Sequence, residues 1–74
     1  MNQSLSPQMV AGKTLRRLIE ENYPSQEEFA YDYGTDVRTI SRYVNQGINK
    51  LDIIQELADF FNLTFTDFFT DREN

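Results

Sequence analysis

Residues 26 to 47, QEEFAYDYGTDVRTISRYVNQG, decide the fold of this chain, because two short helical patterns lie on either side of one glycine. That glycine, Gly34, can adopt the left-handed backbone conformation that a tight corner between two helices requires. Ala30 lies four residues earlier and is small enough to let the second helix of the pair cross closely over the first. The stretch therefore predicts a helix-turn-helix.

The two helices of this motif have distinct apolar and polar sides. Their apolar residues recur at helical spacing, so we expect them to face inward: Phe29, Tyr33, Ile40 and Tyr43. The second helix, about residues 36–45, then keeps an outward face of Val37, Arg38, Ser41 and Arg42. A helix with such a face has the size and the hydrogen-bonding groups to enter the major groove of DNA.

The length and composition of the chain restrict what it can be. It has 74 residues and neither cysteine nor histidine. A chain this short buries only about 60% of its unfolded surface, so its stability depends on close helix packing. We interpret residues 1–74 as a single domain with an ordered core over about 6–70 and a frayed tail at 71–74. Without cysteine or histidine we expect no metal site, and no motif predicts a cofactor.

Other classes of protein are disfavoured by the sequence. No apolar run approaches the roughly 20 residues of a membrane span, and the N-terminus lacks the basic and apolar regions of a secretory signal. We therefore expect a soluble, cytoplasmic protein with no membrane association. We also expect no enzyme, because the chain has no glycine-rich phosphate loop and no carboxylates expected to converge in a pocket.

The net charge of −5 argues against a nucleic-acid partner, but the charge is unevenly distributed. Residues 1–50 contain equal numbers of basic and acidic residues, and the whole excess of acid lies in residues 51–74. If the fold turns the acidic third away from DNA, the surface of the second motif helix can still be locally positive. The weak overall field predicts modest non-specific affinity.

Capping residues and the two prolines predict five helices and no strand. Ser6 is an N-cap followed by Pro7 at the first helical position, where the missing N–H does no harm. Tyr23 precedes Pro24, which disfavours helix, so the first helix should end near Asn22. Capping pairs begin the later helices: Ser25 with Glu28, Asp36 with Thr39 (or Thr35 as the cap), Asn49 with Asp52, and Thr64 with Asp67.

Apolar stripes on the first and fourth helices predict more of the core. The first helix buries Val10 or Ala11, with Leu15, Leu18 and Ile19. The fourth helix, which we expect to end at Asn62, buries Leu51, Ile54, Leu57, Ala58 and Phe61. The short fifth helix holds Phe65, Phe68 and Phe69.

From Leu15 to Phe69 the chain resembles the lambda-repressor-like helix-turn-helix family, which includes Cro and xenobiotic-response-element type regulators. The matching segments are LRRLIEEN, SQEEFAYDYG, TISRYVNQG and LADFFNLTFTDFF. Members of the family have Ser-Gln at the start of the second helix, then alanine and glycine at the same offsets as here. The resemblance implies an all-α, compact five-helix DNA-binding domain whose second and third helices form the helix-turn-helix.

The resemblance also implies which residues contact DNA. Gln26, at the N-terminus of the second helix, would bind the phosphate backbone, as a helix N-terminus favours. Arg38 can bind guanine in bidentate fashion and Val37 can pack on a thymine methyl group. The base-contacting positions fall on Val37, Arg38 and Arg42, with Thr39 and Ser41 as lesser candidates. The backbone-contacting positions fall on Gln26, Ser25, Thr35 and Asn45, with Tyr43 also assigned to the core.

Two positions depart from the family pattern. Relatives often pair an arginine late in the first helix with a glutamate near the end of the third, where this chain has Ile19 and Val44. A packed apolar pair is often as stable as a buried ion pair, so we expect these two side chains to be buried in contact. Relatives usually have glycine where this chain has Gln46, and the loop that follows is shorter here. The resemblance therefore provides no backbone contact from that loop.

Some residues have two interpretations. Arg16 and Arg17 can pair with Glu20 and Glu21 along their own helix or bind phosphate. The C-terminal region holds more phenylalanines than a domain of this size needs. Phe61 and Phe65 are expected in the core, whereas an exposed aromatic cluster would indicate a partner surface. The possible dimer contacts are Phe60, Phe68 and Phe69.

The function expected from these features is sequence-specific binding of double-stranded DNA by a homodimeric transcriptional regulator, a repressor of phage, plasmid or mobile-element type. One alternative is a protein-interaction module, such as an antitoxin, antirepressor or anti-activator, that keeps the fold and binds DNA weakly. Its protein partner would bind the aromatic C-terminal region. Another is the DNA-binding head of a longer regulator.

Overall fold

The computed structural model describes residues 6–70, and this part of the chain contains α-helices, one short 3-10 helix and no strand. The elements are α1 (Pro7–Asn22), α2 (Gln26–Tyr33), α3 (Val37–Gln46), α4 (Leu51–Phe60) and η1 (Thr66–Phe69). The all-α class is confirmed for the described residues. The tail at 71–74, which we expected to fray, lies outside them.

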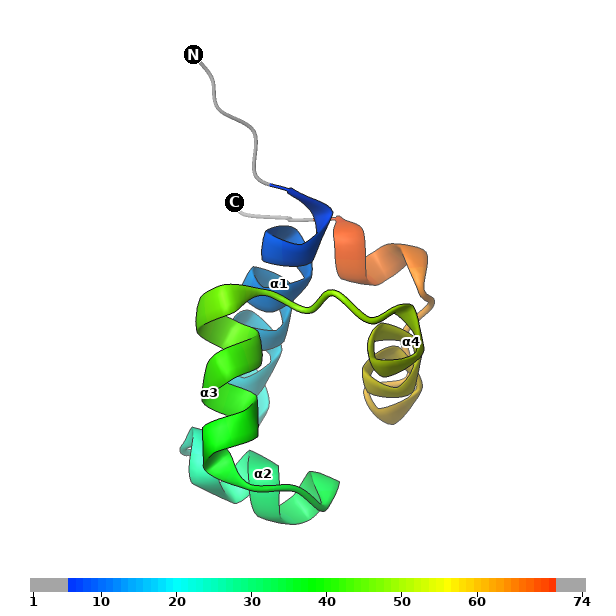
Figure 1. Cartoon of the computed structure of the whole chain (residues 1–74). Helices are drawn as coiled ribbons and strands as arrows, with labels where there is room; N and C mark the ends of the chain where they lie inside the picture. Colours follow the sequence, from blue (N-terminus) through cyan, green and yellow to red (C-terminus); the bar gives the residue numbers. More distant parts are fainter. Residues whose placement is uncertain (1–5, 71–74) are drawn as a thin grey trace.

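The helices pack around α1. Figure 1 shows α3 lying alongside α1, with α2 crossing near the start of α3 and α4 on the other side of the molecule. The 3-10 helix η1 returns to α1 and also contacts α4. The core lies between these elements and consists of Ala11, Leu15, Leu18, Ile19, Phe29, Ala30, Ile40, Val44, Ile48, Ile54, Leu57, Ala58 and Phe68.

The first helix forms as its sequence predicts. The Oγ atom of Ser6 accepts a hydrogen bond from the Met9 N–H at 3.3 Å, and the helix ends at Asn22, before the Tyr23–Pro24 pair. Of the two alternatives for the start of the stripe, Ala11 is fully buried whereas Val10 is only partly buried. The rest of the predicted stripe is also buried: Leu15, Leu18 and Ile19.

A glycine inside α1 determines how closely α1 and α3 approach. A Cβ atom added to Gly12 would lie 2.6 Å from the carbonyl oxygen of Tyr43 and 3.3 Å from the Cα of Gly47. Both neighbours are backbone atoms, so no side chain can move aside to make room. Gly12 therefore allows the backbones of α1 and α3 to pack directly against each other. This role is not evident in the sequence, where a glycine inside a helix shows only its low helix propensity.

The segment from α2 through the corner to α3 begins and turns at the predicted residues. Ser25 Oγ accepts a hydrogen bond from the Glu28 N–H at 3.1 Å, which caps α2. Gly34 has a φ of 99° and takes the left-handed conformation at the corner. Asp36 Oδ1 accepts a hydrogen bond from the Thr39 N–H at 2.9 Å and caps α3. These three local features were read correctly from the sequence because each depends on neighbours within a few residues.

The start of α4 differs from the prediction. Its N-cap is Lys50, and no side chain caps it, so Asn49 was assigned wrongly. Asp52 accepts from the N–H of the next residue, Ile53, at 3.0 Å and does not reach back. Leu51 was placed in the buried stripe but is 66% exposed, because it lies at the very first turn, beyond the edge of the core. α4 ends at Phe60, and two residues later Asn62 takes a left-handed backbone conformation with a φ of 65°.

The last element, expected as a short helix, is a 3-10 helix of four residues, Thr66–Phe69. The predicted capping pair is nevertheless formed: Thr64 N–H donates to Asp67 Oδ2 at 3.0 Å and Asp67 N–H donates to Thr64 Oγ1 at 3.2 Å. The prediction of Phe68 as a dimer contact was wrong, because its side chain is completely buried. Phe68 belongs to η1 and is its buried residue, at the point where the returning chain packs against α1.

Ile19 and Val44 are both buried, at 2% and 5% exposure, and belong to the same core cluster. Their burial was predicted from the replacement of the family's ion pair. The direct contact between the two side chains stays a prediction. The polar link between α1 and α3 lies on the surface instead, where Arg16 Nη2 donates to Asn45 Oδ1 at 3.2 Å.

Five aromatic rings form a cluster between α2 and α4, centred on Phe29. Phe60 is 40% exposed, but its ring contacts those of Phe29 and Tyr33 at centroid distances of 5.7 and 5.2 Å. Phe61 stacks on Phe29 at 5.5 Å and is partly buried, as is Phe65. The aromatic excess therefore mainly stabilises the domain itself, since each such pair adds about 0.5–1.5 kcal/mol.

No helix within residues 6–70 has the length and apolar character needed to cross a lipid bilayer.

Candidate nucleic-acid interface

The outward surface of α3 is set by which of its residues are buried. Ile40 is fully buried and Val44 nearly so, and these two side chains fix the rotation of the helix against α1 and α2. The Asp36 cap fixes its start and Gly47 its end. The remaining faces of α3 are left to solvent, and the polar residues of the sequence pattern lie there.

Six of the residues predicted to contact DNA line one shallow depression of about 580 Å³, which we call the α3 surface. It lies along α3 and extends to the first residue of α2. Its lining contains two arginines and no carboxylate. The residues are Gln26, Val37, Arg38, Ser41, Arg42, Asn45 and Gln46, of which Gln46 was not predicted.

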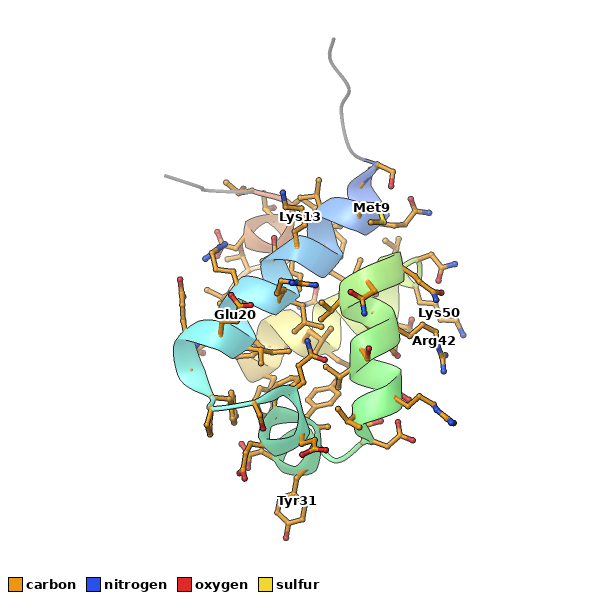
Figure 2. The ribbon with its side chains drawn as sticks, turned by 90° about the vertical axis from the view of Figure 1, so that its left-hand side faces the viewer. Met9, Lys13, Glu20, Tyr31, Arg42 and Lys50 are labelled. Carbon is orange, nitrogen blue, oxygen red and sulfur yellow. The ribbon has the colours of Figure 1, made fainter. Side chains whose placement is uncertain are left out.

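The two arginines of this surface extend into solvent. Arg38 and Arg42 are exposed, and no hydrogen bond or ion pair joins either guanidinium group to another residue in the described range 6–70. Figure 2 shows Arg42 and Lys50 pointing to the same side of the molecule, away from the core. Because arginine has five donors in a planar fork, a partner with paired acceptors is needed to satisfy each group.

The other predicted base-contacting residues differ in how exposed their side chains are to a ligand on the α3 surface. Val37 is 37% exposed, so a methyl group of a ligand can pack on it. Ser41 is half-buried and lines the α3 surface. Thr39 is also half-buried and does not line the depression, and its N–H is already used by the Asp36 cap. The hydrogen bonds from Thr39 hold the pKa of Asp36 below its usual value, with a smaller effect of Arg38.

The predicted backbone contacts are less uniform. Gln26 lies at the first turn of α2 on the edge of the α3 surface, as the prediction requires. Ser25 is exposed, but its hydroxyl oxygen is used as the α2 cap. Thr35 is half-buried beside the corner glycine and does not line the α3 surface. Tyr43 is half-buried and packs against the core, which supports its assignment to the inward face.

Asn45 has side-chain partners in the free protein. Its Oδ1 atom accepts a hydrogen bond from Arg16 Nη2 at 3.2 Å, and its Nδ2 group donates to Ser41 Oγ at 3.2 Å. Arg16 thus pairs across the α1–α3 interface and not with Glu20, whereas Arg17 does contact Glu21 along its own helix at 3.8 Å. The sequence did not show this cross-helix pair, because the two residues are 29 positions apart.

A second depression of about 470 Å³ adjoins the α3 surface and shares Arg42 and Gln46 with it. Most of its other lining residues come from the start of α1 and from the loop after α3, and they include Gln8, Asn49 and Lys50; Tyr43 of α3 and Ile53 of α4 complete it. No DNA contact from this loop was predicted from the sequence. The structure places Lys50 beside Arg42 at this site, and a basic residue in a short loop after the motif was the available signal.

Two acidic residues of α4, Glu56 and Asp59, have partners outside the two depressions. Glu56 Oε1 accepts a hydrogen bond from the Tyr33 hydroxyl at 3.1 Å, and Asp59 accepts from Gln55 at 2.9 Å. Neither carboxylate lines the α3 surface or the adjoining depression. Within residues 6–70 no group of acidic side chains is arranged to hold a metal ion.

Comparison with protein-family models, curated proteins and solved structures found no match to this chain. The resemblance to the lambda-repressor-like family therefore depends on the residues and motifs of the chain itself.

Proposed function

We propose that this chain is a sequence-specific transcriptional regulator that binds double-stranded DNA, with a lambda-repressor-like fold and α3 in the major groove. The observation that carries the proposal is the composition of the α3 surface. Two exposed arginines whose guanidinium groups make no hydrogen bond or ion pair within residues 6–70, a hydroxyl group and an exposed valine lie on one helix that the core holds in place. The arginines and the hydroxyl group can donate to phosphate oxygens and to acceptor atoms on base edges, and the valine can pack on the methyl group of thymine.

Each residue has a definite role in this proposal. Arg38 donates two hydrogen bonds to guanine O6 and N7, and Val37 packs on a neighbouring thymine methyl. Arg42, one turn further along α3, contacts a second base or the adjacent phosphate. Gln26 and the N–H groups at the start of α2 bind a phosphate on one side of the groove. Lys50 neutralises another phosphate from the adjoining depression, a role that its position beside Arg42 supports.

A single α3 contacts only a few base pairs, so we propose that the protein acts as a homodimer on an inverted repeat, with half-sites about one helical turn apart. Phe60 and Phe69 remain the proposed dimer contacts, since both retain exposed area. A repressor of phage, plasmid or mobile-element type fits a small regulator of this kind.

The test is selection of bound sequences from a random DNA pool, followed by affinity measurements on the best site and on random DNA at several salt concentrations. If the protein is a DNA-binding regulator, the selection must recover a preferred sequence. Its affinity must also fall as the salt concentration rises, because phosphate contacts release counterions. A recovered inverted repeat would also support the homodimer. Binding with no salt dependence and no preferred sequence would refute the proposal.

A second function, a protein-interaction module, is favoured by the net charge of −5 and by Leu51, which is 66% exposed at the start of α4. In that case the exposed apolar residues of α4 would contact a protein partner, and DNA affinity would be weak. The same affinity measurements discriminate the two functions. A protein-interaction module should bind the selected site and random DNA equally weakly, whereas a DNA-binding regulator should prefer the selected site.

A further inference from the structure

A chain of side-chain hydrogen bonds runs from α1 onto the α3 surface. Arg16 Nη2 donates to Asn45 Oδ1, and Asn45 Nδ2 donates to Ser41 Oγ, both at 3.2 Å. Arg16 and Asn45 are exposed, and Ser41 is half-buried in the depression that α3 forms. Arg16 on α1 and Asn45 on α3 therefore determine whether the hydroxyl group of Ser41 accepts or donates within the protein.

The direction of each bond follows from the chemistry of the groups. A guanidinium group has donors only, so the atom of Asn45 that faces Arg16 must be the amide oxygen. The NH₂ group of Asn45 is then directed toward Ser41, one helical turn earlier. The oxygen of Ser41 consequently acts as the acceptor, and its hydrogen must point elsewhere.

The hydroxyl hydrogen of Ser41 has no acceptor in the described part of the chain. Serine in a helix often donates to the carbonyl four residues earlier. Thr70 makes such a bond to the carbonyl of Thr66 at 3.3 Å, but Ser41 makes none to Val37 or to any other residue within 6–70. The hydrogen is thus available to a ligand seated on the α3 surface.

We infer that Arg16 is a positioning residue that, through Asn45, makes Ser41 a hydrogen-bond donor toward one DNA base. This inference rests on the proposed function and specifies part of its sequence preference. The N7 atoms of guanine and adenine both accept hydrogen bonds in the major groove and do not distinguish these bases. The bases differ at the exocyclic position, where guanine O6 and thymine O4 accept and the amino groups of adenine and cytosine donate. Directed at that exocyclic position, the Ser41 hydroxyl therefore favours guanine or thymine at the base it contacts.

Substitutions can remove the bond chain or reverse its direction. Ser41→Ala removes the donor, and Arg16→Ala releases the amide of Asn45 so that either of its ends can face Ser41. Asn45→Asp reverses the direction, because a carboxylate only accepts and the Ser41 hydrogen would turn toward it. The oxygen of Ser41 would then face the base as an acceptor. Arg17→Ala is the matched control, since it removes the same charge from α1 outside this bond chain.

The experiment is selection from a random DNA pool with wild type and these four variants, each first shown to be folded by its helical circular dichroism. We expect wild type and Arg17→Ala to favour guanine or thymine about three- to tenfold at one position of each half-site, the size expected for one hydrogen bond. Ser41→Ala and Arg16→Ala should lose that preference. Asn45→Asp should shift it to adenine or cytosine at the same position, with lower overall affinity.

Identical base frequencies for wild type, Arg16→Ala and Asn45→Asp would overturn the inference while leaving the proposed function intact. Failure of wild type to select any sequence would overturn both, so the two results are distinguishable. A second measurement needs no DNA: the side-chain amide protons of Asn45 should shift in the NMR spectrum of Arg16→Ala but not of Arg17→Ala. Unchanged amide signals in Arg16→Ala would also overturn the inference.

Discussion

The hydroxyl group of Thr14 in α1 donates a hydrogen bond to the carbonyl oxygen of Phe68 in η1 at 3.0 Å, across 54 positions of the sequence. Thr14 is the only buried polar side chain among the described residues, at 1% exposure. Its bond satisfies the main chain of the returning segment exactly where Phe68 enters the core, so the last element of the fold is attached to the first.

Thr14→Val should destabilise the domain by about 1–3 kcal/mol, because it keeps the shape of the side chain but leaves the Phe68 carbonyl without its donor. Urea unfolding followed by circular dichroism measures the change. Thr66→Val is the control, since the Thr66 side chain is exposed and should change stability little. Equal midpoints for the two variants would show that the buried bond contributes nothing.

Gly12→Ala should also destabilise the domain, although alanine is the better helix former by about 1 kcal/mol. The added methyl group would lie 2.6 Å from the Tyr43 carbonyl oxygen, so α1 and α3 must move apart at a net cost of about 1–3 kcal/mol. Glu20→Ala, at an exposed site of the same helix, is the control. A Gly12→Ala variant more stable than wild type in thermal unfolding would mean that the two helices separate without loss.

Arg38→Ala should weaken binding to the best selected DNA site by about 1–3 kcal/mol and relax the preference at one base pair. The reason is the loss of a bidentate contact to guanine. Fluorescence anisotropy with labelled DNA measures the affinity, and Arg17→Ala controls for the loss of one positive charge. Wild-type affinity and specificity in Arg38→Ala would show that α3 does not face the DNA in the proposed way.

The stability of the domain should fall at alkaline pH because of Tyr33. Burial, with the hydrogen bond to Glu56, raises the pKa of Tyr33 to about 12 from its ordinary value of 10.0. A group whose pKa is raised in the folded state contributes its full stabilisation below the unfolded pKa and loses it as the pH rises through the folded pKa. The loss should therefore occur between about pH 10 and 12.

This alkaline loss can be measured by urea unfolding at a series of pH values, with tyrosinate absorbance recorded in parallel. Tyr33→Phe cannot ionise, so it should be less sensitive to pH in this window, although it lacks the bond to Glu56 at neutral pH. Tyr31→Phe is the control, because Tyr31 is 87% exposed and points away from the molecule in Figure 2. A pH profile of Tyr33→Phe that matches wild type would contradict the assignment.

The sequence predicted the parts of this structure that depend on near neighbours. The caps at Ser6, Ser25 and Asp36 and the left-handed Gly34 each involve residues within four positions, and the structure confirms them. Most of the candidate DNA contacts also lie on one helix, so helical spacing alone placed Arg38 and Arg42 together on one surface.

Features that depend on the packing of distant segments were not predictable from the pattern. Phe68 was given as a possible dimer contact because the region holds many phenylalanines, whereas its side chain is buried and Thr14 of α1 donates to its carbonyl oxygen. Leu51 was expected inside by its spacing, but the first turn of α4 projects past the core. The Arg16–Asn45 bond and the Gly12 contact both require knowing that α1 and α3 lie side by side.

The way α3 is held at both ends has a consequence for molecular recognition. The Asp36 cap fixes its first turn, and at its other end the backbone N–H of Ile48 donates to the carbonyl oxygen of Gln8 at 3.1 Å. The main chain of α3 is already held in one conformation before a ligand binds, so little backbone entropy of the protein is lost on association. The entropic penalty falls on the long arginine side chains, which are free to move until they are immobilised by their acceptors.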